Sequence, residues 1–278
     1  MVGSDAHSRA RPVSGVAAVP GLLPTGRLPT RHVEHVMGTV VSFDLRDEVA
    51  PTVLTDAVEW LHRVDRTFST YRSDSQISRL DRGDLTAADC DADVRSVLAL
   101  GSALAKASHG YFTVRPAGRL DPSGVVKGWA IERASDILRA GGSANHAVNG
   151  GGDIQLAGEA APGQPWRVGI AHPHQPGELV TVVSGRDIAV ATSGTAERGD
   201  HIVNPVTGRP ATELASITLV GRDLTTVDAY ATAAAAMGHA AREWVRELDG
   251  IAAFAVPAAG APWWSAGWAA VGSVPVAA

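Results

Sequence analysis

The stretch "DPSGVVKGWAIERASDILRAGG" (residues 121–142) predicts a helix with clear start and stop signals. Asp121 suits the N-cap position, and Pro122 suits the first helical position. Apolar residues recur at helical spacing, and the glycine pair 141–142 ends the helix. The segment that follows, "HAVNGGGDIQLAG" (146–158), predicts a strand, a glycine-rich turn and a second strand.

Hydrophobic periodicity also predicts helices and strands on both sides of residues 121–158. Residues 35–47 predict a strand with Val40, Phe43 and Leu45 buried, and residues 70–84 are polar and predict a loop. Further amphipathic helices are expected at 53–69, 93–110 and 225–248, and further strands at 166–172, 179–185, 187–194, 215–221 and 250–256. Strands in hairpin-like order with a few helices favour an α+β fold over a regular βαβ array.

Composition excludes several classes of protein. The chain has 278 residues, of which 45% are hydrophobic and 19% charged, and a formal net charge of −5, so it is globular and an improbable nucleic-acid binder. Its one cysteine, Cys90, can form no internal disulfide. Residues 1–30 predict a flexible tail ahead of one domain at 31–278. Residues 250–278 carry no charged side chain, but prolines interrupt them, so we expect a strand there and no stable membrane insertion.

Lys127 and the run "NGGGD" (149–153) each allow two interpretations. A lysine near a helix start opposes the helix dipole, and a bound phosphate would remove the conflict. Alternatively, Lys127 is a solvated side chain whose stem covers apolar surface. The glycines either present amide groups to an anion or serve a turn that requires positive φ.

Asp228 and Thr232 are four residues apart on a predicted helix, so they share a face. A carboxylate and a hydroxyl on one face suit Mg²⁺, which prefers oxygen ligands. In the alternative interpretation, Thr225 and Asp228 form a capping-box variant that serves only the helix start.

The stretch "ATSGTAERGDHIVNPVTGRPA" (191–211) combines hydroxyl side chains with one histidine between turns. His201 is a candidate proton acceptor for activating a hydroxyl, because imidazole titrates near neutral pH. The alternative is a loop histidine that is hydrogen-bonded to backbone. A lysine at a helix start, a glycine turn, a hydroxyl cluster and an oxygen-ligand face together suit a pyrophosphate held with magnesium.

These motifs, taken in order, resemble the FAD:protein FMN transferases, the ApbE family. The matching pieces span roughly residues 35–240: "MGTVVSF", "STYRSDSQISRLD", "GYFTV", "DPSGVVKGWAIERA", "VNGGGDI", "ATSGTAERGDHIVNPVTGRPA" and "VDAYATAAAAMG". The resemblance implies a single α+β flavin-transferase domain, related to the T-fold, with mixed or antiparallel sheets and packed helices.

The resemblance also implies a reaction. A threonine or serine hydroxyl of an acceptor flavoprotein attacks the FMN phosphorus of FAD in the presence of Mg²⁺, or of Mn²⁺ in its place, and AMP leaves. Members of the family that admit water instead act as FAD pyrophosphatases. We expect a monomer or a homodimer that is cytoplasmic, because no export signal is visible, or exported if a leader precedes this sequence.

Carried over by motif position, the resemblance implies the site residues. The catalytic set is His201, Lys127 and Asp228, with His201 as general base; the metal set is Gly124 through its carbonyl, Asp228 and Thr232. The FAD set is Met37, Tyr71, Tyr111, Phe112, Thr113, Asp121, Lys127, Thr192, Ser193 and His201.

The chain departs from the family pattern at Thr113 and Asn204, where the family usually has Asp, and at Thr195 and Ala196, where an aromatic residue is common. Because of these departures, a non-catalytic FAD-binding protein is a third hypothesis, beside the FMN transferase and the FAD pyrophosphatase. An oligomeric structural protein is the fourth hypothesis.

Overall fold

The computed structural model describes residues 29–195 and 202–273. Within these residues, eight strands form one antiparallel sheet in the order β1-β2-β3-β4-β7-β8-β9-β10, and β5 and β6 form a separate hairpin. The strands are β1 Thr30–Val36, β2 Thr39–Leu45, β3 His146–Gly150, β4 Asp153–Ala157, β5 Trp166–Ala171, β6 Leu179–Gly185, β7 Ala189–Ser193, β8 Leu214–Gly221, β9 Ala252–Pro257 and β10 Trp263–Trp264.

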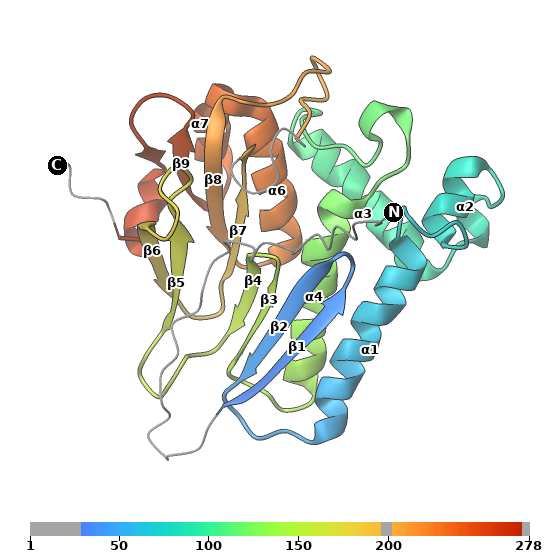
Figure 1. The fold of residues 1–278 in the computed structure, drawn as a ribbon, viewed down its shortest axis with the longest axis horizontal. Helices are drawn as coiled ribbons and strands as arrows, with labels where there is room; N and C mark the ends of the chain where they lie inside the picture. The colour runs from blue at the N-terminus through green and yellow to red at the C-terminus, as the bar shows by residue number, and fades with distance from the viewer. Residues whose placement is uncertain (1–28, 196–201, 274–278) are drawn as a thin grey trace, which may run out of the picture.

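Helices cover one face of the large sheet, and the β5–β6 hairpin covers part of the other face (Figure 1). The α-helices are α1 Pro51–Phe68, α2 Gln76–Arg82, α3 Ala92–Ala107, α4 Ser123–Ala140, α6 Leu224–Met237 and α7 Ala241–Trp244. Short 3₁₀ turns lie at η1 Ala87–Asp89, η2 Pro116–Gly118, η3 Gly238–Ala240, η4 Val245–Glu247 and η5 Ala266–Ala270. This arrangement confirms the predicted α+β class.

The helical layer and the hairpin layer each enclose an apolar core. The larger core joins buried side chains of β2 with those of α1, α4 and α6, and α4 packs between α1 and α6. The smaller core lies between the other sheet face and the hairpin, around Trp166, Phe254 and Trp268. Because layers cover both faces of the sheet here, β4, β8 and β9 are buried along their whole length.

The segment predicted as one strand at 35–47 instead contains the end of β1, a hairpin turn and all of β2. Met37 (φ 54°) and Gly38 (φ 67°) occupy left-handed conformations between β1 and β2. Val41, Phe43 and Leu45 are buried on one face of β2, whereas Val40 is 39% exposed. The prediction for Val40 was wrong because side chains alternate between faces, and Val40 is out of step with Phe43 and Leu45.

One helix that was predicted as a loop and one helix that ends early also differ from the prediction. The polar segment at 70–84 contains α2, which the Ser75 hydroxyl caps by accepting the N–H of Ser78 at 3.0 Å and which Gly83 (φ 82°) terminates. The helix predicted over 225–248 breaks at Gly238 (φ 63°), because a right-handed helix cannot continue through that conformation.

The uncharged C-terminal stretch forms β9, β10 and η5 as far as residue 273. None of the helices in the described ranges is apolar over the length that a bilayer crossing requires.

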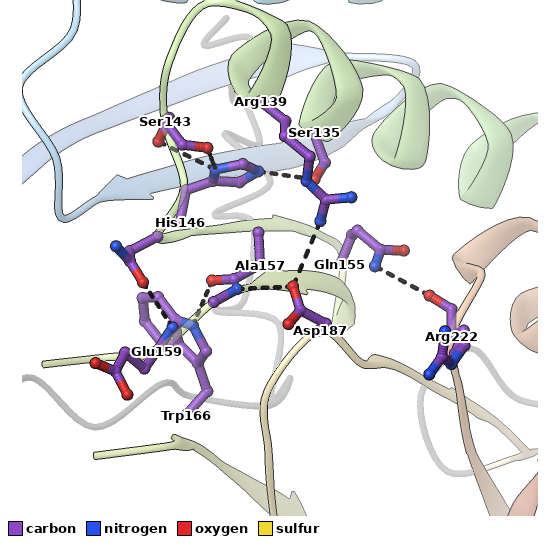
Figure 2. Close-up of polar contacts among 12 residues, drawn as sticks. Ser135, Arg139, Ser143, His146, Gln155, Ala157, Glu159, Trp166, Asp187 and Arg222 are labelled. Atoms are coloured by element: carbon purple, nitrogen blue, oxygen red, sulfur yellow. Dashed lines mark hydrogen bonds and ion pairs between the residues drawn. The ribbon is translucent and has the colours of Figure 1, made fainter. Parts of the chain in front are cut away.

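A polar network at the C-terminal end of α4 fixes the entry into β3 (Figure 2). The buried His146 ring lies between the Ser135 hydroxyl, 2.7 Å from Nε2, and the Ser143 carbonyl, 3.1 Å from Nδ1. Because a carbonyl can only accept, Nδ1 carries the proton and Ser135 donates to Nε2. Burial lowers the pKa of His146 to about 4, so the ring is neutral in the folded protein.

We expect this buried histidine to make the protein less stable in mild acid. Its folded-state pKa lies below that of the unfolded chain, so unfolding takes up a proton as the pH falls below about 6.5. Between pH 7 and pH 5 this coupling removes about 2 kcal/mol from the free energy of unfolding. Urea denaturation of the wild type and of His146→Gln at both pH values measures the difference. The exposed His174→Gln is the control, and an equal pH dependence in all three proteins would contradict the assignment.

Candidate active site

The candidate site begins where α4 and α6 approach each other at Gly128. A Cβ atom at Gly128 would lie 2.7 Å from the Leu224 carbonyl oxygen and 2.9 Å from the Asp228 Cβ, so a side chain larger than hydrogen does not fit. The approach lets the buried Asp228 carboxylate accept the backbone N–H of Gly128 at 3.0 Å. This amide is the one that faces the Gly124 carbonyl in a regular helix, so the carboxylate lies beside the first turns of α4.

Side chains from other elements satisfy the N-terminal amides of α6. Glu132 of α4 accepts both the N–H of Thr225 at 2.9 Å and its hydroxyl at 2.5 Å. Gln155 of β4 accepts the N–H of Leu224 at 3.1 Å. The alternative in which Thr225 and Asp228 only cap their own helix was therefore wrong: Thr225 pairs with Glu132, and Asp228 pairs with α4.

Lys127 lies between two carboxylates at the start of α4. Its Nζ forms an ion pair with Asp153 Oδ2 and lies 3.4 Å from Asp228 Oδ1. Both carboxylates are buried, whereas the Lys127 side chain is 30% exposed. Burial raises the pKa of Asp228 above its ordinary value, and Asp153 adds to the rise, while the Lys127 ammonium opposes it.

Asp153 connects this ion cluster to the hydroxyl-rich end of β7. Its Oδ1 accepts the backbone N–H of Thr192 at 3.0 Å. The Thr192 hydroxyl in turn lies 2.9 Å from the hydroxyl of Thr218 on β8. The sequence analysis selected Lys127, Asp228 and Thr192 from three separate motifs. In the structure Lys127 contacts Asp228 directly, and Asp153 links Lys127 to Thr192.

The glycine run serves the β3–β4 turn. Gly151 (φ 63°) and Gly152 (φ 102°) adopt left-handed conformations, and the Asn149 side chain accepts the N–H of Gly152 at 3.0 Å. The alternative of a turn that requires positive φ thus accounts for these glycines. The turn also fixes Asp153 as the first residue of β4, directly beside Lys127.

The aromatic candidates differ in exposure. Phe112 is buried, and its ring lies 3.2 Å from where a Cβ at Gly124 would be, so it supports the first turn of α4. Met37 and Tyr111 are half-buried at the edge of the larger core. Tyr71 is 99% exposed in the loop between α1 and α2.

The polar candidates near α4 have local roles as well. Asp121 accepts the N–H of Ser123 at 3.0 Å, which places its carboxylate at the helix start, although α4 begins at Ser123 and not at Pro122. Thr113 accepts the N–H of Arg115 at 3.0 Å, and Ser193 ends β7 half-exposed. His201, the candidate base, lies outside the described residues.

The candidate metal ligands at this site are oxygen atoms. The described residues hold no group of three or more His, Cys, Asp or Glu side chains that could bind a metal ion. Mg²⁺ rarely needs such a group, because it is commonly held by one or two carboxylates together with substrate phosphates and water. The Asp228 carboxylate, the Thr232 hydroxyl one turn later and the Gly124 carbonyl are chemically suited to such a cation.

Comparison with known families agrees with the resemblance seen in the sequence. The model of the ApbE family matches residues 37–117 and 113–255. The chain belongs to the ApbE family.

Relatives of this ApbE chain carry one functional name. The FAD:protein FMN transferase of Vibrio cholerae is 34% identical over 130 residues, which are 43% of this chain and 39% of that protein. The FAD:protein FMN transferase of Rhodobacter capsulatus is 32% identical over 139 residues, which are 47% of this chain and 26% of that protein. The matched stretch thus spans less than half of the length of either relative.

Solved ApbE structures share the fold over almost their whole length. The ApbE protein of Thermotoga maritima superposes with a TM-score of 0.78 at 23% identity, covering 87% of this chain and 98% of that one. The flavin transferase ApbE from Vibrio cholerae gives a TM-score of 0.77 at 23% identity, covering 87% and 99%.

Sequence reasoning missed two carboxylates of this ApbE site. Asp153 was noted only as the end of the glycine run, although a charged residue directly before the apolar "IQLA" was a usable signal. Glu132 is one of several charged residues on the predicted helix, and only its contact with Thr225, 93 positions along the chain, distinguishes it.

We expect Gly128→Ala to lower the free energy of unfolding by about 1–3 kcal/mol, because the methyl group would push α6 away from α4. Urea denaturation measures the change. Gly267→Ala is the control, since the Cβ there would meet its nearest neighbour at an ordinary 3.7 Å. Equal stability of the two variants would mean that the helices can separate freely at Gly128.

Proposed function

We propose that this protein transfers the FMN part of FAD to a threonine or serine hydroxyl of an acceptor flavoprotein and releases AMP. The observation that carries the proposal is the cluster of Lys127, Asp153 and Asp228 at the start of α4, in a chain of the ApbE family. Relatives named FAD:protein FMN transferase support the same reaction.

In this proposal Lys127 binds the pyrophosphate of FAD. Its ammonium is the exposed member of the cluster and lies at a helix N-terminus, where the dipole also attracts anions. Thr192 and Ser193 offer hydroxyl groups from the end of β7, and Asp121 offers a carboxylate at the start of α4. Phosphoryl transfer depends chiefly on such positioning and on neutralisation of charge.

The flavin side of FAD would meet the aromatic candidates. Tyr71 would stack on the flavin, because its ring is exposed. Phe112 is buried and would instead support the first turn of α4 near the cofactor. Met37, Tyr111 and Thr113 would line the remaining wall, each half-buried.

Mg²⁺ fits the oxygen atoms that the chain offers here. Asp228, Thr232 and the Gly124 carbonyl would hold it, and the buried carboxylate, already hydrogen-bonded to Gly128, is fixed in place for this purpose. When bound, the ion would neutralise charge on the phosphate oxygens.

The proposed chemistry exchanges the phosphoanhydride bond of FAD for a phosphoester bond to the acceptor. The acceptor hydroxyl oxygen bonds to the FMN phosphorus, the bond from that phosphorus to the bridging oxygen breaks, and AMP leaves with that oxygen. The proton of the hydroxyl passes to a base, for which His201 is the candidate on sequence grounds.

The test is to incubate the protein with FAD, Mg²⁺ and a domain that carries an acceptor threonine. We expect AMP release together with a mass gain on the acceptor equal to one FMN, and neither product without metal. Intact-mass spectrometry of the acceptor and chromatography of AMP give the two readouts.

Other outcomes point to the alternatives. AMP and free FMN without a labelled acceptor would mean hydrolysis of FAD, with water in place of the hydroxyl. Tight binding of FAD without AMP at any metal concentration would mean a flavin-binding protein. Absence of FAD binding would remove the whole proposal.

We expect Asp228→Asn to lower the rate of Mg²⁺-dependent AMP release by about 100-fold or more, because the amide keeps the Gly128 contact but loses the charge that attracts the metal. The matched control is Asp223→Asn, an exposed position five residues earlier whose side chain does not cap α6. Circular dichroism checks folding, and unchanged AMP release in Asp228→Asn would exclude a role at the metal.

A further inference from the structure

Asp153 is a buried carboxylate for which the proposed reaction has no direct use. Its side chain is 2% exposed, so it cannot touch a bound ligand to any useful extent. Yet it holds Lys127 through Oδ2 and the backbone N–H of Thr192 through Oδ1. It therefore links, through one carboxylate, the candidate phosphate-binding group on α4 to the hydroxyl-bearing end of β7.

The sign of the charge separates positioning from binding. FAD carries a negatively charged pyrophosphate, so a second carboxylate beside Lys127 opposes binding by Coulomb repulsion. Asp153 weakens the electrostatic attraction that Lys127 and the helix N-terminus provide. Any contribution of Asp153 to the reaction has to come through the groups that it holds.

The local structure makes this contact a rigid one. The Gly151–Gly152 turn fixes the start of β4, and Asp153 pairs in the ladder with Gly150. The Lys127 side chain is long and carries several rotatable bonds, so an ion pair with a rigid partner removes much of its freedom. An ammonium that is held in advance stabilises transition-state charge without reorganisation.

We infer that Asp153 is a positioning residue of the transferase site: it fixes Lys127 and the end of β7 relative to each other at a cost in affinity for FAD. The inference rests on the proposed function. It predicts that removing the charge of Asp153 lowers kcat but raises the affinity for FAD, because this charge supports turnover and opposes binding.

The test compares the wild type with Asp153→Asn. The asparagine oxygen can still accept the Thr192 N–H, but the charge that holds Lys127 is gone. We expect kcat for AMP release to fall by about 10-fold to 100-fold, the loss typical of a misplaced catalytic group. The Kd for FAD, measured by flavin fluorescence in EDTA without turnover, should fall, because one negative charge beside the pyrophosphate is removed.

Asp187→Asn is the matched control. Asp187 also accepts a backbone N–H, that of Gly158 at 3.0 Å, and pairs with Arg139 at 3.6 Å (Figure 2). This pair lies near the opposite end of α4, about 18 Å from Lys127 at 1.5 Å per residue. We expect its kcat and Kd to match those of the wild type.

A double-mutant cycle with Lys127→Met tests the route of the effect. If Asp153 acts through Lys127, adding Asp153→Asn to Lys127→Met should cost little more activity. The same fold-loss in both backgrounds would overturn the inference. Lys127→Met leaves two carboxylates facing each other, so if it is unfolded by circular dichroism or inactive, the kcat and Kd of Asp153→Asn decide.

Two results in Asp153→Asn alone would overturn the inference. One is a kcat within about two-fold of the wild type, and the other is a loss of FAD affinity that parallels the loss of kcat, as for a merely structural residue. A wild-type protein that releases no AMP and labels no acceptor would instead overturn the proposed function, so the two failures are distinguishable.

Discussion

The close approach of α4 and α6 at Gly128 is the constraint on which the rest of the site depends. Hydrogen is the largest substituent that the contact admits at this position. Because the backbones lie so close, a carboxylate on one helix reaches an amide of the other. The same approach brings Lys127, one residue earlier, beside Asp228. A larger residue at this position would separate both pairs at once.

The layers around this contact determine how far its charged groups are buried from water. The larger core lies between the sheet and the helices and keeps water from Asp228, which raises the pKa of its carboxyl. Lys127 is partly exposed at the helix start and opposes that shift. The carboxylates of the cluster are buried, and the ammonium of Lys127 is partly exposed to solvent. The accessible charge is therefore positive, which suits an anionic ligand.

The sequence was informative where local signals and periodicity agree. Start and stop residues placed α4 within two residues of its observed bounds, and apolar runs located β3 through β8. It failed where the deciding interaction is distant or where the periodic face is short. The helix α2 buries only Ile77, too little for a periodic signal, and the break at Gly238 resembles any glycine in an alanine-rich helix.

The site residues also fall into those with a local sequence signal and those defined by distant contacts. Lys127, Asp228 and Thr192 stand in recognisable motifs, so the motifs could nominate them. Asp153 and Glu132 act on residues of other elements, 39 and 93 positions away for Thr192 and Thr225. A single sequence carries no record of such pairs, because each residue taken alone is compatible with an ordinary solvated charge.

The pairing of β4 with β7 has a consequence for how the molecule folds. The β5–β6 hairpin is inserted between these two neighbours, and the cluster draws on residues from 127 to 228. Contacts this distant in sequence close large loops and tend to form slowly. Local opening of any one of the contributing segments would disperse the cluster. A small molecule bound there would therefore oppose opening of all of them together, and its concentration would raise the melting temperature of the whole domain.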